Sequence, residues 1–169
     1  MRVYGITGWK NSGKTTLVER LVAECVERGF SVSTIKHAHH GFDVDQPGKD
    51  SHRHRAAGAG QVLVASRLRW ALMTELGPEA GEPALGDLLA RLDPVDLVLV
   101  EGYKRDAHPK IEARRADTAQ ALIASGDATV EAVASDAPLP GLDRPVFDLD
   151  DVAGIADFIL GRLGLPARR

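Results

Sequence analysis

Apolar and polar positions along this chain follow two alternating patterns. Residues 2–7 form a short run of β-branched and aromatic side chains, which predicts a strand. Residues 14–28 instead place apolar side chains on one helical stripe and charged side chains on the opposite face, and Gly29 predicts the end of this helix. The first 29 residues are therefore expected to form a strand, a loop and an amphipathic helix.

The same alternation continues through the rest of the sequence. Further strands are predicted at residues 31–36, 62–66, 70–75, 96–100, 111–113, 130–134 and 146–147, and helices at 50–59, 85–92 and 151–163. Asp50 or Ser51 is the expected N-cap of the helix at 50–59. This order predicts an α/β fold with a doubly wound, mostly parallel sheet flanked by helices and a small antiparallel part near residues 61–75.

The loop after the first strand matches the pattern G-x-x-x-x-G-K-[ST]. It consists of Gly8, Trp9, Lys10, Asn11, Ser12, Gly13, Lys14 and Thr15, with Thr16 following. In this motif backbone N–H groups surround a phosphate, the lysine reaches the β- and γ-phosphates, and the hydroxyl ligates Mg²⁺. Because a strand, a glycine loop and a helix aim the helix N-terminus at an anion, residues 1–169 are predicted to form a single nucleotide-binding domain of the P-loop NTPase type.

A second chemical signal is the acid that ends the apolar strand at 96–100. Glu101 follows this strand directly, and in such folds the carboxyl end of a buried parallel strand lies beside the phosphate loop. Glu101 is therefore predicted to hold Mg²⁺ directly or through a water, or to orient a water. The usual residue here in many nucleotide hydrolases is aspartate, so neither direct ligation of the metal nor a general-base role is fixed for Glu101. A catalytic role stays open, and a solvated acid at the end of the strand is the alternative.

A polar, histidine-rich segment follows the strand at 31–36. Its candidate ligand- or partner-binding residues are His37, His39, His40, Asp43, Asp45 and Asp50. Their spacing matches no standard zinc pattern and no thiolate is nearby, although imidazoles and carboxylates suit several divalent metals. Contact with an anion or a partner is the favoured interpretation, and a solvated loop and a metal site stay open as alternatives.

Base preference is not encoded by the usual guanine motif, since N-K-x-D is absent from the chain. Asp136, which follows the strand at 130–134, could accept hydrogen bonds from guanine N1–H and N2–H₂. A turn residue before Pro138 is the equal alternative for Asp136.

Composition narrows the function classes further. The formal net charge of −3 argues against a nucleic-acid partner, because sequence-independent binding of nucleic acid needs a cationic surface. No secretory signal pattern and no apolar run long enough to span a bilayer are present, so no membrane association and a cytoplasmic location are expected. The single Cys25 lies on the apolar stripe of the first helix, which fits a buried thiol in a reducing compartment.

Several stretches together resemble a known family. They are G-W-K-N-S-G-K-T-T-L at 8–17, K-H-A-H-H-G-F-D-V-D-Q-P-G-K-D-S at 36–51, A-G-A at 57–59, V-L-V-E-G-Y-K at 98–104 and A-V-A-S-D at 132–136. In this order they are similar to the molybdopterin-guanine dinucleotide biosynthesis adapter proteins, the MobB family, across residues 2 to about 163. The histidine-rich segment together with E-G-Y-K is more specific to that family than the phosphate loop.

The resemblance implies a GTP-binding protein of molybdenum cofactor biosynthesis with at most weak GTPase activity. It implies a homodimer that associates with the guanylyltransferase attaching GMP to molybdopterin, with molybdopterin itself a candidate ligand. Two other function classes stay open. A GTP-dependent metallochaperone would use the histidine-rich segment as its metal store, and a small-molecule kinase would be expected to carry an arginine-rich lid over the phosphates.

Overall fold

The computed structural model describes residues 1–38 and 41–166. The chain divides into two compact units, one formed by residues 1–37 and 88–169 and the other by residues 38–87. Among the described residues, no helix combines the length and apolar character needed to cross a bilayer.

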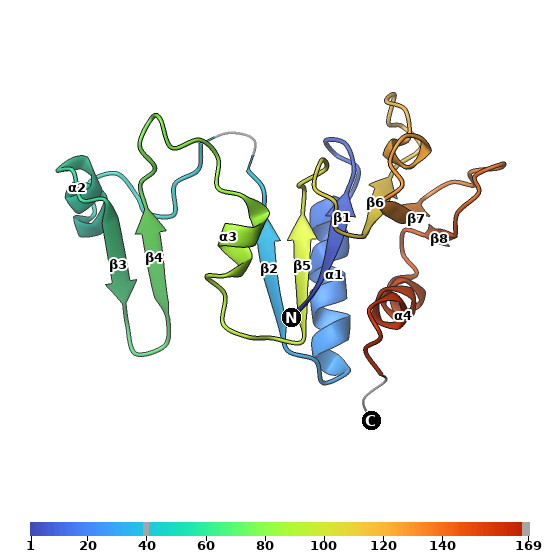
Figure 1. The fold of residues 1–169 in the computed structure, drawn as a ribbon, viewed down its shortest axis with the longest axis horizontal. Coiled ribbons are helices and arrows are strands. Elements are labelled where there is room, and N and C mark those ends of the chain that lie inside the picture. Colours follow the sequence, from blue (N-terminus) through green and yellow to red (C-terminus); the bar gives the residue numbers. More distant parts are fainter. Residues whose placement is uncertain (39–40, 167–169) are drawn as a thin grey trace. The chain divides into compact units, whose positions relative to one another are not determined.

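A six-stranded sheet forms the centre of the first unit, in the order β2-β5-β1-β6-β7-β8 (Figure 1). Every neighbouring pair in this sheet is parallel. The strands are β1 (Arg2–Thr7), β2 (Val32–Lys36), β5 (Leu97–Glu101), β6 (Lys110–Arg114), β7 (Val130–Ser135) and β8 (Val146–Asp148). Because the strands are parallel, the carboxyl ends of β1, β2, β5 and β6 meet at one edge of the sheet.

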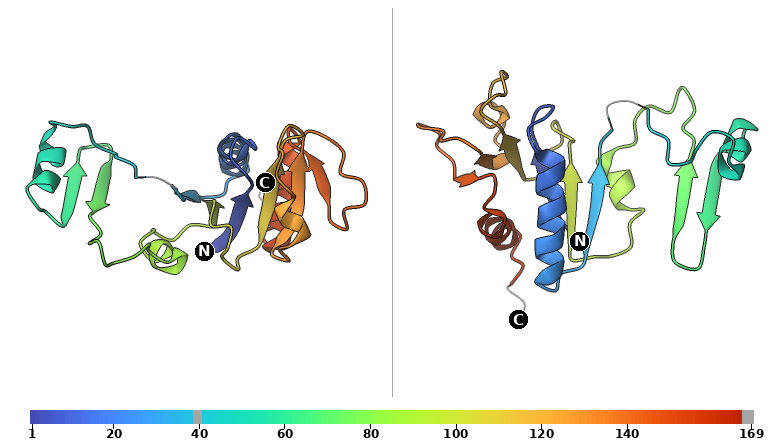
Figure 2. Two further views of the ribbon diagram at one scale, coloured as in Figure 1. Left: turned by 90° about the horizontal axis from the view of Figure 1, so that it is seen from above. Right: turned by 180° about the vertical axis from the view of Figure 1, so that it is seen from behind.

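Two helices cover one face of this sheet. Helix α1 (Lys14–Glu27) lies in front of the central strands when the molecule is seen from behind (Figure 2), and helix α4 (Val152–Arg162) packs beside it. Their apolar stripes pack on alternate side chains of the sheet, including Tyr4, Ile6 and Leu99. Cys25 on α1 belongs to this core and is buried, as its position on the apolar stripe predicts. A smaller core lies where the short 3-10 helix η1 (Ile123–Ser125) packs on β7.

The second unit contains α2 (Asp50–Ala56) and an antiparallel pair, β3 (Gln61–Ala65) and β4 (Trp70–Thr74). Its polar centre is Arg55, whose guanidinium pairs with the carboxylates of Asp43, Asp45 and Glu75 at 2.9, 2.5 and 2.6 Å. The prediction of a mostly parallel, doubly wound α/β fold with a small antiparallel part near residues 61–75 is confirmed.

Three local predictions are wrong at element ends. Helix α2 ends at Ala56 and not at residue 59, because the amides of Gly58 and Ala59 bond to carbonyls three and five residues back. The N-cap of α2 is Lys49, so neither Asp50 nor Ser51 caps this helix. The amide of Lys49 donates to the carbonyl of Gln46, and this turn leads the chain into the helix one residue early. Helix α3 (Leu85–Leu89) is shorter than the predicted 85–92, because Arg91 and Leu92 bond to carbonyls three residues back and tighten the chain out of the α-helix.

Candidate functional site

The phosphate-loop sequence connects the carboxyl end of β1 to the N-terminus of α1. Glycine is required at Gly8, where φ is +145° and a Cβ atom would lie 2.4 Å from the carbonyl oxygen of Ala113. Gly13 is the N-cap of α1, with φ of +90°, and no side chain caps the helix. The N–H groups of the first turn of α1 are therefore left for an external acceptor.

A hollow of about 510 Å³ lies against this helix N-terminus. Its lining residues are Asn11, Ser12, Gly13, Lys14, Thr15, Thr16, Arg115 and Asp117. The other predicted nucleotide-binding residues of the loop, Gly8, Trp9 and Lys10, do not line it, and Lys10 is exposed. The hollow thus combines an uncapped helix N-terminus with the predicted phosphate-binding lysine.

Positive charge gathers around Lys14. The Lys14 ammonium donates to the carbonyl of Trp9 at 2.6 Å. Burial lowers the pKa of Lys14, and the charges of Lys104 and Lys36 lower it further, while Glu101 opposes them. An anion bound here would offset this repulsion between cations.

The two residues predicted to hold Mg²⁺ lie in direct contact. Thr15 Oγ1 donates to Glu101 Oε1 at 2.8 Å, although the two residues are 86 positions apart in sequence. The Lys36 ammonium lies 3.2 Å from the same carboxylate oxygen and 3.3 Å from Thr15 Oγ1. A hydroxyl and a carboxylate are hard oxygen donors of the kind that Mg²⁺ prefers, so the donor set fits this ion.

Trp9 connects the phosphate loop to the segment that follows β6 through a side-chain hydrogen bond. Its indole Nε1 donates to the carbonyl of Ala121 at 2.8 Å, and the Lys104 ammonium lies 4.2 Å from the ring centroid. The latter is a cation–π geometry. Trp9 therefore has a packing role between two loops of the site.

Asp136 lies at the end of β7 and is exposed, but it does not line the hollow. Its Oδ1 accepts a hydrogen bond from the amide of Ala116 at 2.7 Å. The hollow is lined instead by Arg115 and Asp117 on either side of that amide, and the sequence reasoning missed both residues. A usable signal was their position within four residues after the predicted strand at 111–113.

The histidine-rich segment has two different surroundings. The amide of His37 donates to the carbonyl of Glu101 at 2.9 Å, and the centroids of the His37 and Tyr103 rings are 4.9 Å apart.

The acids of this segment are paired with arginines. Asp43 and Asp45 are paired with Arg55, and Asp50 lies 3.8 Å from Arg53. His39 and His40 lie outside the described residues. Within the described part of the chain, no three histidine, cysteine or acidic residues gather in a way that could hold a metal ion.

Comparisons with known proteins agree with this architecture. Residues 3–136 match the family described as molybdopterin guanine dinucleotide synthesis protein B. The Escherichia coli (strain K12) molybdopterin-guanine dinucleotide biosynthesis adapter protein is 46% identical, over 90% of this chain and 87% of its own length. The Haemophilus influenzae protein of the same name is 45% identical, over 92% of this chain and 85% of its own.

Solved structures show the same fold. A MobB homologue from Bacillus stearothermophilus is 31% identical, with a TM-score of 0.73 and coverage of 98% of this chain and 100% of that one. MobB of Bacillus subtilis is 26% identical, with a TM-score of 0.75 and coverage of 96% and 98%. The chain therefore belongs to the MobB family of molybdopterin guanine dinucleotide synthesis proteins.

Proposed function

We propose that this protein is a cytoplasmic adapter that binds GTP with Mg²⁺ and assists the guanylyltransferase that attaches GMP to molybdopterin. The observation that carries the proposal is the hollow at the α1 N-terminus, where Lys14 lies beside the Thr15–Glu101 pair. The names of the relatives, molybdopterin-guanine dinucleotide biosynthesis adapter proteins, supply the pathway.

In this proposal the amides of the first α1 turn and Lys14 bind the phosphates, while Thr15 and Glu101 hold the ion. Bound Mg²⁺ would neutralise charge on the phosphate oxygens. At most weak hydrolysis is expected, because no glutamine, the residue that orients the attacking water in many GTPases, is among the lining residues of the hollow. Arg53, Arg55 or an arginine of a second copy could supply an arginine finger, and of these Arg55 is already paired with three carboxylates. Molybdopterin stays a candidate ligand of the segment that begins at His37.

Calorimetric titration of the protein with Mg²⁺·GTP and Mg²⁺·ATP, without and with the guanylyltransferase, tests the proposal. We expect GTP to bind at least about tenfold more tightly than ATP, a difference of roughly 1.4 kcal/mol, and the transferase to form a complex. Tighter binding of ATP together with no transferase complex would contradict the adapter function. Rapid phosphoryl transfer to a small acceptor would instead identify a kinase.

The homodimer is proposed to form through the uncovered face of the β3–β4 hairpin. Directly paired residues share a face, and on one face Leu63, Leu72 and Trp70 remain 59%, 42% and 64% exposed. A two-stranded hairpin is marginal by itself, and an exposed apolar patch of this kind is typical of an interaction site. A second copy of the chain would supply the same apolar face in a self-complementary contact.

Leu63→Asp is expected to convert the dimer to a monomer, because the interface would then bury an unpaired carboxylate. Sedimentation velocity at micromolar concentration measures the change. Val146→Asp is the matched control, since Val146 is also an exposed apolar strand residue but belongs to the first unit. A monomeric wild-type protein, or a dimer unaffected by Leu63→Asp, would rule out this interface.

Lys36 is expected to compete with a divalent cation for the Thr15–Glu101 pair. Without nucleotide, Lys36→Met should bind Mn²⁺, a paramagnetic substitute for Mg²⁺, roughly fivefold more tightly, since a positive charge near the oxygen donors is removed. Electron paramagnetic resonance titration measures free Mn²⁺, and Lys49→Met, which removes an exposed lysine of the other unit, is the control. Unchanged or weaker Mn²⁺ binding by Lys36→Met would show that Lys36 does not compete.

A further inference from the structure

One wall of the hollow is formed by the loop that follows β6. Arg115 and Asp117 are the two lining residues that do not come from the phosphate-loop stretch at 11–16. Strand β6 is the parallel neighbour of β1, and Thr7 is paired to Glu112. The loops that follow these two strands therefore leave the sheet at the same edge. The β6 loop is therefore placed to contact the part of a ligand that extends beyond its phosphates.

This loop is braced from three sides. Asp136, at the end of β7, accepts from the Ala116 amide at 2.7 Å, and Trp9 of the phosphate loop donates to the Ala121 carbonyl at 2.8 Å. Arg114, at the end of β6, donates to the carbonyls of Gln120 and Thr118 at 2.9 and 3.4 Å. These bonds hold the backbone of the loop and leave the Asp117 carboxylate unused. Bracing of this kind pre-organises a recognition loop before its ligand arrives.

Asp117 is the only acid that lines the hollow, and among the described residues no donor pairs with its carboxylate. A carboxylate accepts hydrogen bonds and repels phosphates, so its natural partner is a neutral group rich in donors. Arg115, the other lining residue of this loop, has its guanidinium near Gly13. The phosphate-loop residues, the Arg115 guanidinium and the Asp117 carboxylate thus line the same hollow.

Guanine is the base that fits an isolated carboxylate. Its N1–H and N2–H₂ groups are adjacent donors that match the two carboxylate oxygens. Adenine has a lone pair at N1, which a carboxylate repels. We propose that the Asp117 carboxylate recognises guanine by accepting hydrogen bonds from its N1–H and N2–H₂ groups; this inference rests on the proposed nucleotide binding. Asp136 is then a positioning residue, which holds the Asp117 loop through the Ala116 amide.

The test uses the full chain and four probes: the Mg²⁺ complexes of GTP, ATP, XTP and inorganic tripolyphosphate. Asp117→Asn should lower GTP affinity roughly 30-fold, as expected for loss of a bidentate base contact. It should raise XTP affinity, since the asparagine amide can donate to the additional carbonyl of xanthine. Binding of ATP and tripolyphosphate should stay unchanged, and Asp93→Asn, which alters an exposed acid outside the hollow, should change none of the four.

Asp136→Ala should lower the ratio of GTP to ATP affinity about fivefold, within the range for one hydrogen bond. XTP binding should not improve, and Asp136→Asn should restore most of the GTP preference because its amide oxygen can still accept from Ala116. A purely structural role for Asp136 would alter stability but leave the ratio unchanged.

The affinities for the four probes distinguish a wrong nucleotide site from a wrong assignment of base recognition to Asp117. If the wild type binds neither GTP nor tripolyphosphate, the proposed nucleotide site itself is wrong. If the wild type prefers GTP but Asp117→Asn leaves that preference intact, or weakens all four probes equally, Asp117 does not read the base.

Discussion

Lys14→Ala is expected to lower the affinity for Mg²⁺·GTP by roughly 100-fold, because it removes charge-assisted hydrogen bonds to two phosphates. Lys14 lines the hollow, and its ammonium already bonds to the neighbouring Trp9 carbonyl. Alanine is a good helix former at this first position of α1, so the fold should be retained. Calorimetry measures the affinity, and circular dichroism checks the fold.

Lys10→Ala is the matched control for this variant. Lys10 belongs to the same loop but is exposed and does not line the hollow, so its loss should alter GTP affinity by less than about threefold, as expected for a distant surface charge. Equal losses in the two variants would point to a general effect of loop charge. Unchanged affinity of a folded Lys14→Ala protein would contradict the phosphate-loop assignment.

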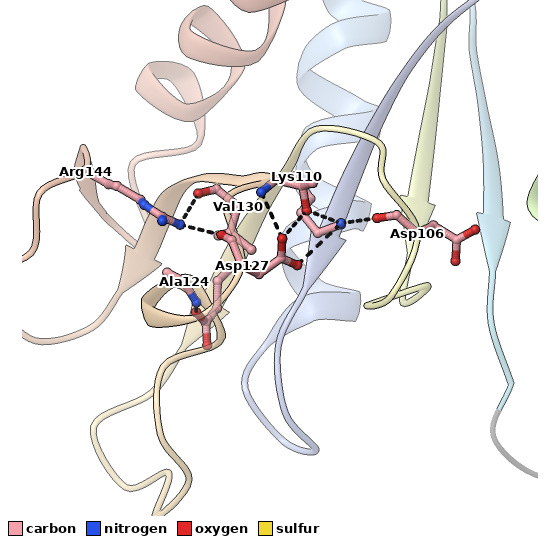
Figure 3. Close-up of polar contacts among 8 residues, drawn as sticks. Asp106, Lys110, Ala124, Asp127, Val130 and Arg144 are labelled. Carbon is pink, nitrogen blue, oxygen red and sulfur yellow. Dashed lines mark hydrogen bonds and ion pairs between the residues drawn. The ribbon is translucent and has the colours of Figure 1, made fainter.

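The second large effect is expected at Lys110, the centre of a buried polar network in the first unit (Figure 3). Lys110 is fully buried, and its ammonium donates to the carbonyl of Asp106 at 2.5 Å and to Thr129 Oγ1 at 2.6 Å, with Asp127 Oδ2 at 3.8 Å. Burial lowers the pKa of Lys110, and the charge of Asp127 opposes this shift. Arg144 closes the network from the other side by donating to the carbonyls of Asp127 and Val130.

Lys110→Met should lower the free energy of unfolding by about 3 kcal/mol, the low end of the range for breaking a buried pair, because Asp127 keeps some solvent contact. Methionine fills much of the lysine volume but leaves the partner oxygens without a donor. Urea denaturation measures the change, and Lys49→Met, at an exposed lysine, should lie within about 0.5 kcal/mol of wild type. Equal midpoints for the two variants would show that the network does not stabilise the fold.

Local patterns account for most of the elements. The strands at β1, β5 and β7 and the helices α1 and α4 agree with the predicted ranges to within one or two residues. Their periods of two and 3.6 residues, with Gly29 after α1, are properties of neighbouring positions and need no tertiary information. The start of α2 was mispredicted because capping propensity favoured Asp50, whereas the turn at Gln46–Lys49 determines where the helix begins.

The candidate site also contains features that follow from local sequence and features that depend on the tertiary structure. The phosphate loop is contiguous, so its eight residues could be recognised directly in the sequence, and the acid at 101 could be placed at the end of a buried strand. The position of Lys36 against Thr15 and Glu101 could not, because it depends on β2 and β5 being neighbours in the sheet. Strand order is decided by packing between distant segments, which spacing along the chain does not encode.

The acid that lines the hollow shows what local patterns leave undecided. The sequence alone determined that an α/β fold carries a phosphate loop and that acids follow the later strands, because both are local patterns. Only the tertiary structure decided that Asp117 lines the hollow while Asp136 holds the loop behind it. The physical reason is the order β1-β6-β7, which places the end of β6 next to the phosphate loop and the end of β7 one strand further away.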